Sequence, residues 1–302
     1  MRLPLPAPLL LVLTVLGAVS GVAPWSDVSA QSSSRERTLF VSAVDGDGKP
    51  VDGLGPEAFE VREDGARREI LRVSRATEPI DIALLVDNST AAADELLFLR
   101  SSLSGFVKKM AIGNRVAVIT LADRPTIRVD YTNDGARLSD AVNGLFSMPQ
   151  SGMTLLDALT EVSQGLAKRE TPRAVIVPVI TDGTEFTNTY QRDVVRELKR
   201  AGAALHMVTV GQFFVDNNDR GSRERSFLLD AGPAETGGQR VTLLSPMGLD
   251  LALAKLAAEL SSQYKVVYSR PESLIAPSKV TVSSARPTLV VRGTPARGQN
   301  GG

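Results

Sequence analysis

The chain has 302 residues, with 34 Lys and Arg against 34 Asp and Glu, no Cys, one His and one Trp. This balance of charge excludes a general affinity for nucleic acid or for an anionic membrane surface, because both require an excess of Lys and Arg. The lack of Cys excludes disulfides, thiolate metal sites and a Cys nucleophile. A single His leaves little room for a His-rich metal site or a Ser-His-Asp triad.

The first thirty residues have the pattern of a secretory signal peptide. Arg2 precedes an apolar stretch from Leu3 to Val22, and small residues precede the expected cleavage site after Ala30. We therefore expect an exported mature chain, periplasmic or secreted, with no membrane span. The alternative is an uncleaved anchor, but the apolar run from Leu9 to Val19 is shorter than the ~20 residues that a spanning helix needs.

Short strand patterns occur in two regions, residues 38–78 and 263–294. Each region alone buries little apolar surface, so we expect the two to pair into one small accessory β subdomain. Residues 31–37 are polar and are expected to form a disordered leader. Residues 295–302 are rich in Gly and are expected to form a disordered tail.

Residues 79–262 alternate apolar segments of strand length with helical periodicity, which predicts an α/β domain with a doubly wound, mostly parallel sheet. Ile80–Val86 and Ala174–Thr181 are nearly continuous apolar segments, typical of parallel strands that are covered on both faces. Pro178 is unusual in such a strand, and a bulge is one explanation. The segments Val116–Leu121 and Thr126–Tyr131 are too close for a helical crossover, so we expect a hairpin at the sheet edge.

The other predicted elements complete the alternation. Leu96, Leu99, Leu103, Phe106 and Met110 recur at helical spacing. Further helices are expected at Leu138–Phe146, Leu155–Lys168, Asp193–Arg200, Phe227–Leu229 and Leu249–Leu260, and further strands at Leu205–Val210 and Arg240–Leu244.

Polar side chains follow the two buried strands directly. Asp87 and Ser89 come after Ile80–Val86, and Asp182 comes after Ala174–Thr181. The carboxyl ends of parallel strands form the edge at which open α/β sheets bind ligands. Thr154 precedes the helix that begins at Leu155. Two carboxylates and two hydroxyls are hard oxygen donors, which suit Mg²⁺ or Mn²⁺.

The order Asp87-x-Ser89-x-Ala91, then Thr154, then Asp182-Gly183 on this scaffold resembles the von Willebrand factor type A family and its metal-ion-dependent adhesion site (MIDAS). The similarity covers roughly residues 79–262. The flanking segments, Phe59–Gly65 and Ser262–Tyr264, look like an exported bacterial subgroup of this family.

The resemblance implies the role of each residue. Ser89 and Thr154 would bind the cation through their hydroxyls, and Asp87 and Asp182 would hold it directly or through water. A free coordination position would then accept a Glu or Asp carboxylate from a partner protein, so the protein would be a binder and not an enzyme. Ala91 stands where the family has a second Ser, which makes the expected site partly degenerate.

Other interpretations of the same residues stay open. Ser89 and Thr154 could cap the following helices while Asp182 orders a turn, with no cation present. The protein would then be a metal-independent scaffold or interaction protein that keeps the fold. A metal-assisted hydrolase would use Asp87 or Asp182 on bound water, but no general acid or base with an obvious position accompanies them.

Two further features are expected to have structural and not functional roles. His206 lies in an apolar run and is expected to be a hydrogen-bonded strand residue. The loop Asp216–Gly221 contains several acidic and amide side chains, but Arg220 occupies a position that a calcium loop gives to a ligand. We expect a solvated loop there.

Overall fold

The computed structural model describes residues 34–272 and 275–296. The expected signal peptide at residues 1–30 lies outside them. In this part of the chain, no helix combines the length and the apolar character that are needed to span a membrane.

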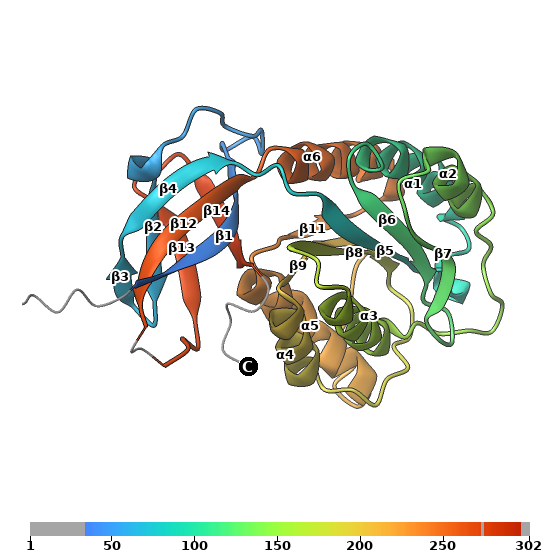
Figure 1. Ribbon diagram of the computed structural model, residues 1–302. Coiled ribbons are helices and arrows are strands. Elements are labelled where there is room, and N and C mark those ends of the chain that lie inside the picture. The colour runs from blue at the N-terminus through green and yellow to red at the C-terminus, as the bar shows by residue number, and fades with distance from the viewer. Residues whose placement is uncertain (1–33, 273–274, 297–302) are drawn as a thin grey trace, which may run out of the picture. The chain divides into compact units, whose positions relative to one another are not determined.

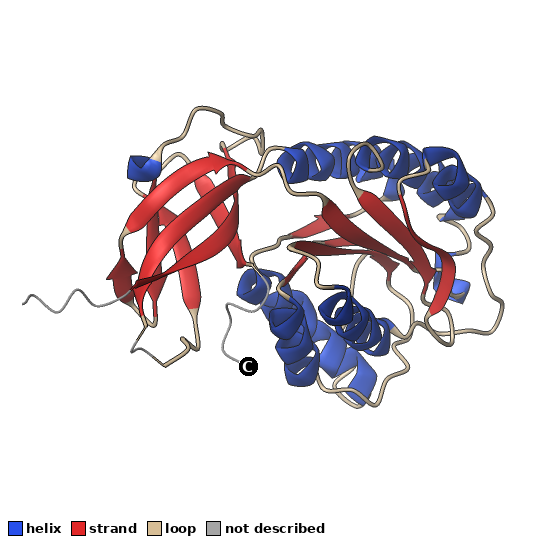
Figure 2. Ribbon diagram, in the orientation of Figure 1, coloured by secondary structure: helices blue, strands red, loops and turns tan. Residues whose placement is uncertain are grey.

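The central sheet of the described residues has seven strands in the order β11-β10-β8-β5-β6-β7, with β9 paired to β8 (Figures 1 and 2). All pairs are parallel except β6 with β7, which confirms both the mostly parallel sheet and the edge hairpin. The strands are β5 (Ile80–Val86), β6 (Arg115–Thr120), β7 (Thr126–Thr132), β8 (Arg173–Thr181), β9 (Ala203–Leu205), β10 (Met207–Val210) and β11 (Arg240–Leu243).

Helices cover both faces of this sheet (Figure 1). One face carries α1 (Leu96–Met110), α2 (Gly135–Asn143) and α6 (Leu249–Ser261), and the other carries α3 (Leu155–Arg169), α4 (Gln191–Ala201) and α5 (Arg220–Thr236). Short 3₁₀ helices are η1 (Pro56–Ala58), η2 (Thr90–Ala92) and η3 (Pro246–Gly248).

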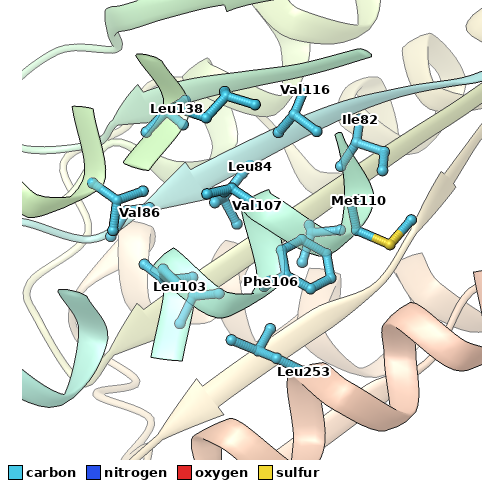
Figure 3. Close-up of a cluster of buried hydrophobic side chains, with 14 of the residues drawn as sticks. Ile82, Leu84, Val86, Leu103, Phe106, Val107, Met110, Val116, Leu138 and Leu253 are labelled. Atoms are coloured by element: carbon cyan, nitrogen blue, oxygen red, sulfur yellow. The ribbon is translucent and has the colours of Figure 1, made fainter. Parts of the chain in front are cut away.

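Strand β5 explains why the sheet has two separate cores. Its side chains alternate, so Ile82 and Leu84 pack with α1 and α6, whereas Ala83 and Leu85 pack with α3, α4 and α5. Figure 3 shows the first cluster, in which Ile82 and Leu84 lie among side chains of α1 such as Phe106. Burial on both faces accounts for the continuous apolar sequence of β5.

Pro178 lies in β8, at the point where the neighbouring strand on one side changes from β9 to β10. Its register with β5 continues without a shift, with Leu85 opposite Pro178, so a bulge in this pairing does not explain the proline. On the other side, β9 pairs with residues 174–176 and β10 with residues 179–181. The Ile176 carbonyl accepts from His206 N on that side, and backbone groups of a strand point the same way every second residue. The missing N–H of Pro178 therefore faces the gap between β9 and β10.

The strands before and after the α/β region pair with one another, as expected. One sheet has the order β14-β1-β12-β4 and the other β13-β2-β3, and their inner faces share an apolar core that includes Val61, Val266 and the ring contact between Phe59 and Tyr264. The strands are β1 (Ser34–Val44), β2 (Phe59–Glu63), β3 (Ala66–Arg68), β4 (Ile70–Arg75), β12 (Tyr264–Pro271), β13 (Val280–Ser284) and β14 (Val290–Pro295).

The ends of this β region differ from expectation. Residues 34–37, assigned above to a disordered leader, belong to β1 and pair with β12, from Ser34 opposite Pro271 to Arg37 opposite Tyr268. A polar segment can form a strand because the ladder bonds are made by the backbone. At the other end, Pro295 was expected to begin the disordered tail, but it belongs to β14. Residues 297–302 lie outside the described residues. The division at residues 78 and 262 stays a prediction.

Candidate functional site

Asp87 joins the two central strands at their carboxyl ends. Its carboxylate is fully buried. Oδ1 accepts from Ser89 N at 2.9 Å, and Oδ2 accepts from Thr181 N at 3.1 Å and from Thr181 Oγ1 at 2.5 Å. Because Thr181 ends β8 and Ser89 follows β5, this one carboxylate fixes the loops after both strands. The sequence placed Asp87 at this edge, and the structure agrees.

Ser89 presents a buried hydroxyl that has no hydrogen-bond partner among the described residues. A Cβ atom placed on Gly183 would lie 2.9 Å from Ser89 Oγ, 3.3 Å from Ala91 Cβ and 3.8 Å from Asp87 Oδ2. The loop after β5 and the loop after β8 therefore meet around the Ser89 hydroxyl. Buried polar groups without partners are uncommon, and each one calls for an explanation.

Thr154 lies at the start of α3, in the segment next to these loops. Its Oγ1 donates to the Leu121 carbonyl at 2.8 Å. The preceding residues are tied to the first loop, since Thr90 Oγ1 donates to Met148 O at 3.1 Å. Neither Ser89 nor Thr154 makes a side-chain capping bond, so the capping interpretation is wrong for both hydroxyls.

Asp182 is paired with a residue of α5. Its side chain is 31% exposed, and Oδ1 accepts from Arg225 Nη2 at 3.2 Å. The Arg225 side chain is only 5% exposed, and its Nη1 also donates to the Gly183 carbonyl. The Arg225 guanidinium carbon lies 5.1 Å from the centre of the Phe213 ring. One oxygen of the Asp182 carboxylate is thus engaged by α5 and is not directed only toward Asp87 and Ser89.

Glu185 anchors the same loop to the N-terminus of α3. The residue is buried, and Oε1 accepts from Leu156 N at 3.2 Å, whereas Oε2 has no partner among the described residues. Burial raises the pKa of the Glu185 carboxyl to about 8, although the Leu156 and Leu155 amides and Arg225 oppose this rise. Glu185 is therefore largely protonated at neutral pH.

The family model for the von Willebrand factor type A (VWA) domain matches residues 81–224. Residues 81–224 belong to the VWA domain family. No curated protein matches the sequence.

Solved structures similar to the chain have low sequence identity. Proximal thread matrix protein 1 from the mussel byssus matches with 16% identity and a TM-score of 0.48, over 69% of this chain and 50% of that chain. A structure of the same mussel protein with a zinc-occupied MIDAS motif has a TM-score of 0.45, with 16% identity and the same coverage. The vWF domain of the pilus tip protein Mfa5 from Porphyromonas gingivalis has 14% identity and a TM-score of 0.47, over 61% of this chain and 96% of that chain. The chain spans about half the length of the mussel protein.

Two residues at the site of this VWA domain were not predicted from the sequence. Arg225 lies 43 positions after Asp182, in a helix whose sequence has no strong periodic pattern, so no local signal indicates the pair. Glu185 follows Asp182-Gly183 by two residues, but a charged residue in a polar loop is normally solvated. Only the tertiary contact with α3 reveals its burial.

Proposed function

We propose that this protein is a non-enzymatic binding module that engages a protein ligand at the carboxyl-end edge of the VWA sheet. The site holds a divalent cation, Mg²⁺ or Mn²⁺, at a partly degenerate MIDAS. VWA domains are typically protein-interaction modules, which supports the general class of function. The proposed ligand group is a Glu or Asp carboxylate of the partner, and nucleic acid is not a proposed partner.

The unpartnered Ser89 hydroxyl carries this proposal. It is buried at the loop edge, next to the Asp87 carboxylate and to Gly183. A hydroxyl oxygen in that position has a lone pair for a cation, and its desolvation is offset if a cation is bound. The same hydroxyl would be an unexplained cost to folding without a ligand.

The donor set fits a hard cation that keeps several waters. Ser89 and Thr154 would hold the cation through their hydroxyls, and Asp87 and Asp182 would hold it directly or through water. All four side chains offer oxygen atoms, which suit Mg²⁺ more than a soft ion. Ala91 contributes no oxygen. Such an ion supplies an electrophilic positive charge to which a partner carboxylate binds.

The surroundings of the site suit a protein ligand. Phe146 and Phe186 are 54% and 55% exposed, and both lie in loops next to the site. The Phe146 carbonyl accepts from Asn88 Nδ2 at 3.1 Å in the first loop, and the Phe186 ring lies against Gly152. Exposed aromatic side chains around a polar centre are enriched in protein interfaces.

The place of action is part of the proposal. The sequence pattern of residues 1–30 supports export, with cleavage near Ala30 and a final location in the periplasm or outside the cell.

A metal-independent scaffold that keeps the VWA fold is the second candidate. Two observations favour it: Ala91 removes one expected hydroxyl ligand, and the Asp182 carboxylate already has a positive partner in Arg225. A metal-assisted hydrolase has less support, because Asp87 already accepts three hydrogen bonds from the protein and Asp182 is paired with Arg225.

Cation-dependent thermal unfolding tests the proposal. We expect Mg²⁺ or Mn²⁺ to raise the unfolding midpoint of the wild type but not of the Ser89→Ala variant. Ser163→Ala is the matched control, because Ser163 in α3 is also buried with an unpartnered hydroxyl. A pull-down from the exported fraction, with and without EDTA, tests the partner. If cations leave the wild-type midpoint unchanged and EDTA leaves partner capture unchanged, the metal-independent scaffold replaces the proposal.

A further inference from the structure

Arg225 brings a buried positive charge to the loop that is proposed to hold a cation. Its guanidinium donates to Asp182 Oδ1 and to the Gly183 carbonyl, and it packs on the Phe213 ring. A guanidinium that is 5% exposed needs partners for its charge, since an unpaired buried charge is strongly destabilising. The two loop oxygens are its polar partners in this region.

The helix that carries Arg225 is fixed to the same loop at several points. Gly221 contacts the Glu185 carbonyl so closely that a Cβ atom would clash with it. Gln191 N donates to Glu224 Oε2 at 2.9 Å, which joins the end of the loop to the first turns of α5. Arg225 therefore approaches Asp182 from a rigidly docked helix and not from a mobile side chain on the surface.

We propose that Arg225 is a positioning residue that competes with a divalent cation for Asp182. Without a cation, the guanidinium takes over the role of holding the loop of residues 182–186 against the rest of the site. When a cation binds, it must share the Asp182 carboxylate with Arg225 or displace it. This inference rests on the proposed cation site, which it extends by naming the residue that sets the affinity of that site.

The charges give the direction of the effect. Asp87 and Asp182 are two carboxylates, and Arg225 offsets one of them before any cation arrives. A positive charge a few ångströms from a divalent ion weakens its binding by a factor of roughly ten or more, even at a water-like dielectric constant. With a divalent ion in place, the three side chains and the ion have a net positive charge, which favours a carboxylate ligand. Arg225 thus lowers the affinity of the site for the cation and strengthens the attraction of the site for an acidic partner.

Binding of Mn²⁺, measured by the electron paramagnetic resonance signal of the free ion, tests the competition. We expect Arg225→Gln to bind Mn²⁺ roughly tenfold more tightly than the wild type, because the competing charge is lost. Arg223→Gln is the matched control, because it removes the same charge from an exposed position of the same helix, where the Arg223 guanidinium donates to the Asn217 carbonyl. Its affinity for Mn²⁺ should equal that of the wild type.

Hydrogen exchange in EDTA gives a second readout that needs no bound ion. We expect the amides of residues 182–186 to exchange faster in Arg225→Gln than in the wild type or Arg223→Gln, and Mg²⁺ to restore their protection. If Arg225→Gln fails to fold, Arg225→Lys replaces it, because Lys keeps the charge but cannot make both bonds. Its loop should exchange at an intermediate rate.

The outcomes separate this inference from the proposed function. If the wild type binds Mn²⁺ and Arg225→Gln binds it no more tightly, the competition is wrong and the proposed cation site stands. If only Arg225→Gln binds, the competition is right, and the cation part of the proposed function is wrong for the natural chain. If neither protein binds Mn²⁺, or if loop exchange does not respond to Arg225→Gln, the inference is wrong.

Discussion

Gly183 lies so close to Ser89 that a methyl group on its Cα would come within 2.9 Å of the Ser89 hydroxyl oxygen. The Gly183→Ala change would fill the space in front of the Ser89 hydroxyl, which has no partner among the described residues. We expect this variant to lose the stabilisation that Mg²⁺ or Mn²⁺ gives the wild type. We also expect a loss of about 1 kcal/mol in the free energy of unfolding without a cation, as overpacking usually causes.

Gly165→Ala controls for the change of residue type. A Cβ atom at this exposed position of α3 meets nothing within 4 Å, so the variant should keep the cation response. Its stability should rise slightly because Ala favours a helix. Cation titrations followed by thermal unfolding measure both effects. An unaltered cation response in Gly183→Ala would show that the ion does not use the Ser89 hydroxyl.

Restoring a hydroxyl at position 91 tests whether the rest of the site is intact. Ala91 is exposed, and its Cβ lies 3.3 Å from the Cβ position of Gly183, so a Ser there borders the same space as Ser89. We expect Ala91→Ser to tighten Mn²⁺ binding several-fold, because one water ligand is replaced by a protein oxygen. The matched control is Ala93→Ser, an exposed position at the end of the same short helix. Equal affinities for all three proteins would contradict a site limited by Ala91.

The main features of the fold could be predicted because they depend on local patterns. The apolar run of β5, the helical spacing in α1 and the short connection between β6 and β7 are each contained in a few consecutive residues. Asp87 and Asp182 could be placed at one edge because parallel strands end on the same side. The strand at residues 34–37 could not be predicted, because its ladder with β12 joins residues more than 200 positions apart.

The electrostatics of the site could not be predicted for the same reason. Arg225 reaches Asp182 from a residue 43 positions away in the chain, and the buried Glu185 carboxyl contacts the N-terminus of α3. Likewise, His206 was expected to be hydrogen-bonded, but both ring nitrogens are without partners among the described residues, so that expectation is wrong. In the loop at residues 216–221, the Asp219 carboxylate accepts from Ser222 N at 2.7 Å and thereby caps α5. Burial and pairing of charged groups are properties of the folded chain.

Glu185 predicts a loss of stability at alkaline pH. Its folded pKa of about 8 lies above the ordinary value of 4.5, so the folded state binds the proton more tightly than the unfolded state does. The resulting stabilisation is complete below pH 4.5, decreases as pH rises and is lost above pH 8. Glu185→Gln mimics the protonated form. We expect the variant to match the wild type at pH 5 and to exceed it at pH 8.5 by a few kcal/mol.

Urea unfolding at the two pH values measures this difference. Glu161→Gln is the control, because Glu161 is an exposed residue of α3. It should show no pH-dependent gain. A Glu185→Gln curve parallel to that of the wild type from pH 5 to 8.5 would mean that the carboxyl ionises as readily in the folded protein as in the unfolded chain.

His206 predicts the opposite response, a loss of stability in mild acid. Its side chain is buried without a hydrogen bond, and burial lowers the pKa of the imidazole to about 4, although Glu259 opposes this effect. The unfolded chain binds a proton near pH 6.5, whereas the folded protein does not, so stability is full above pH 6.5 and decreases as pH falls toward 4. By pH 4.5 the loss should be about 2 to 3 kcal/mol.

The chain has one His, so this titration can be assigned to a single residue. His206→Leu keeps an apolar side chain of similar size in the core and removes the titrating group. The comparison is made in a Glu185→Gln background, because Glu185 titrates over the same pH range with the opposite sign. Free energies of unfolding from urea titrations, followed by circular dichroism from pH 7 to pH 5, should decrease when His206 is present and stay nearly level in the His206→Leu variant. Carboxyl groups with ordinary pKa values contribute mainly below this range. If both proteins lose stability equally, the folded state protonates His206 as easily as the unfolded chain, which would require a polar partner for the imidazole.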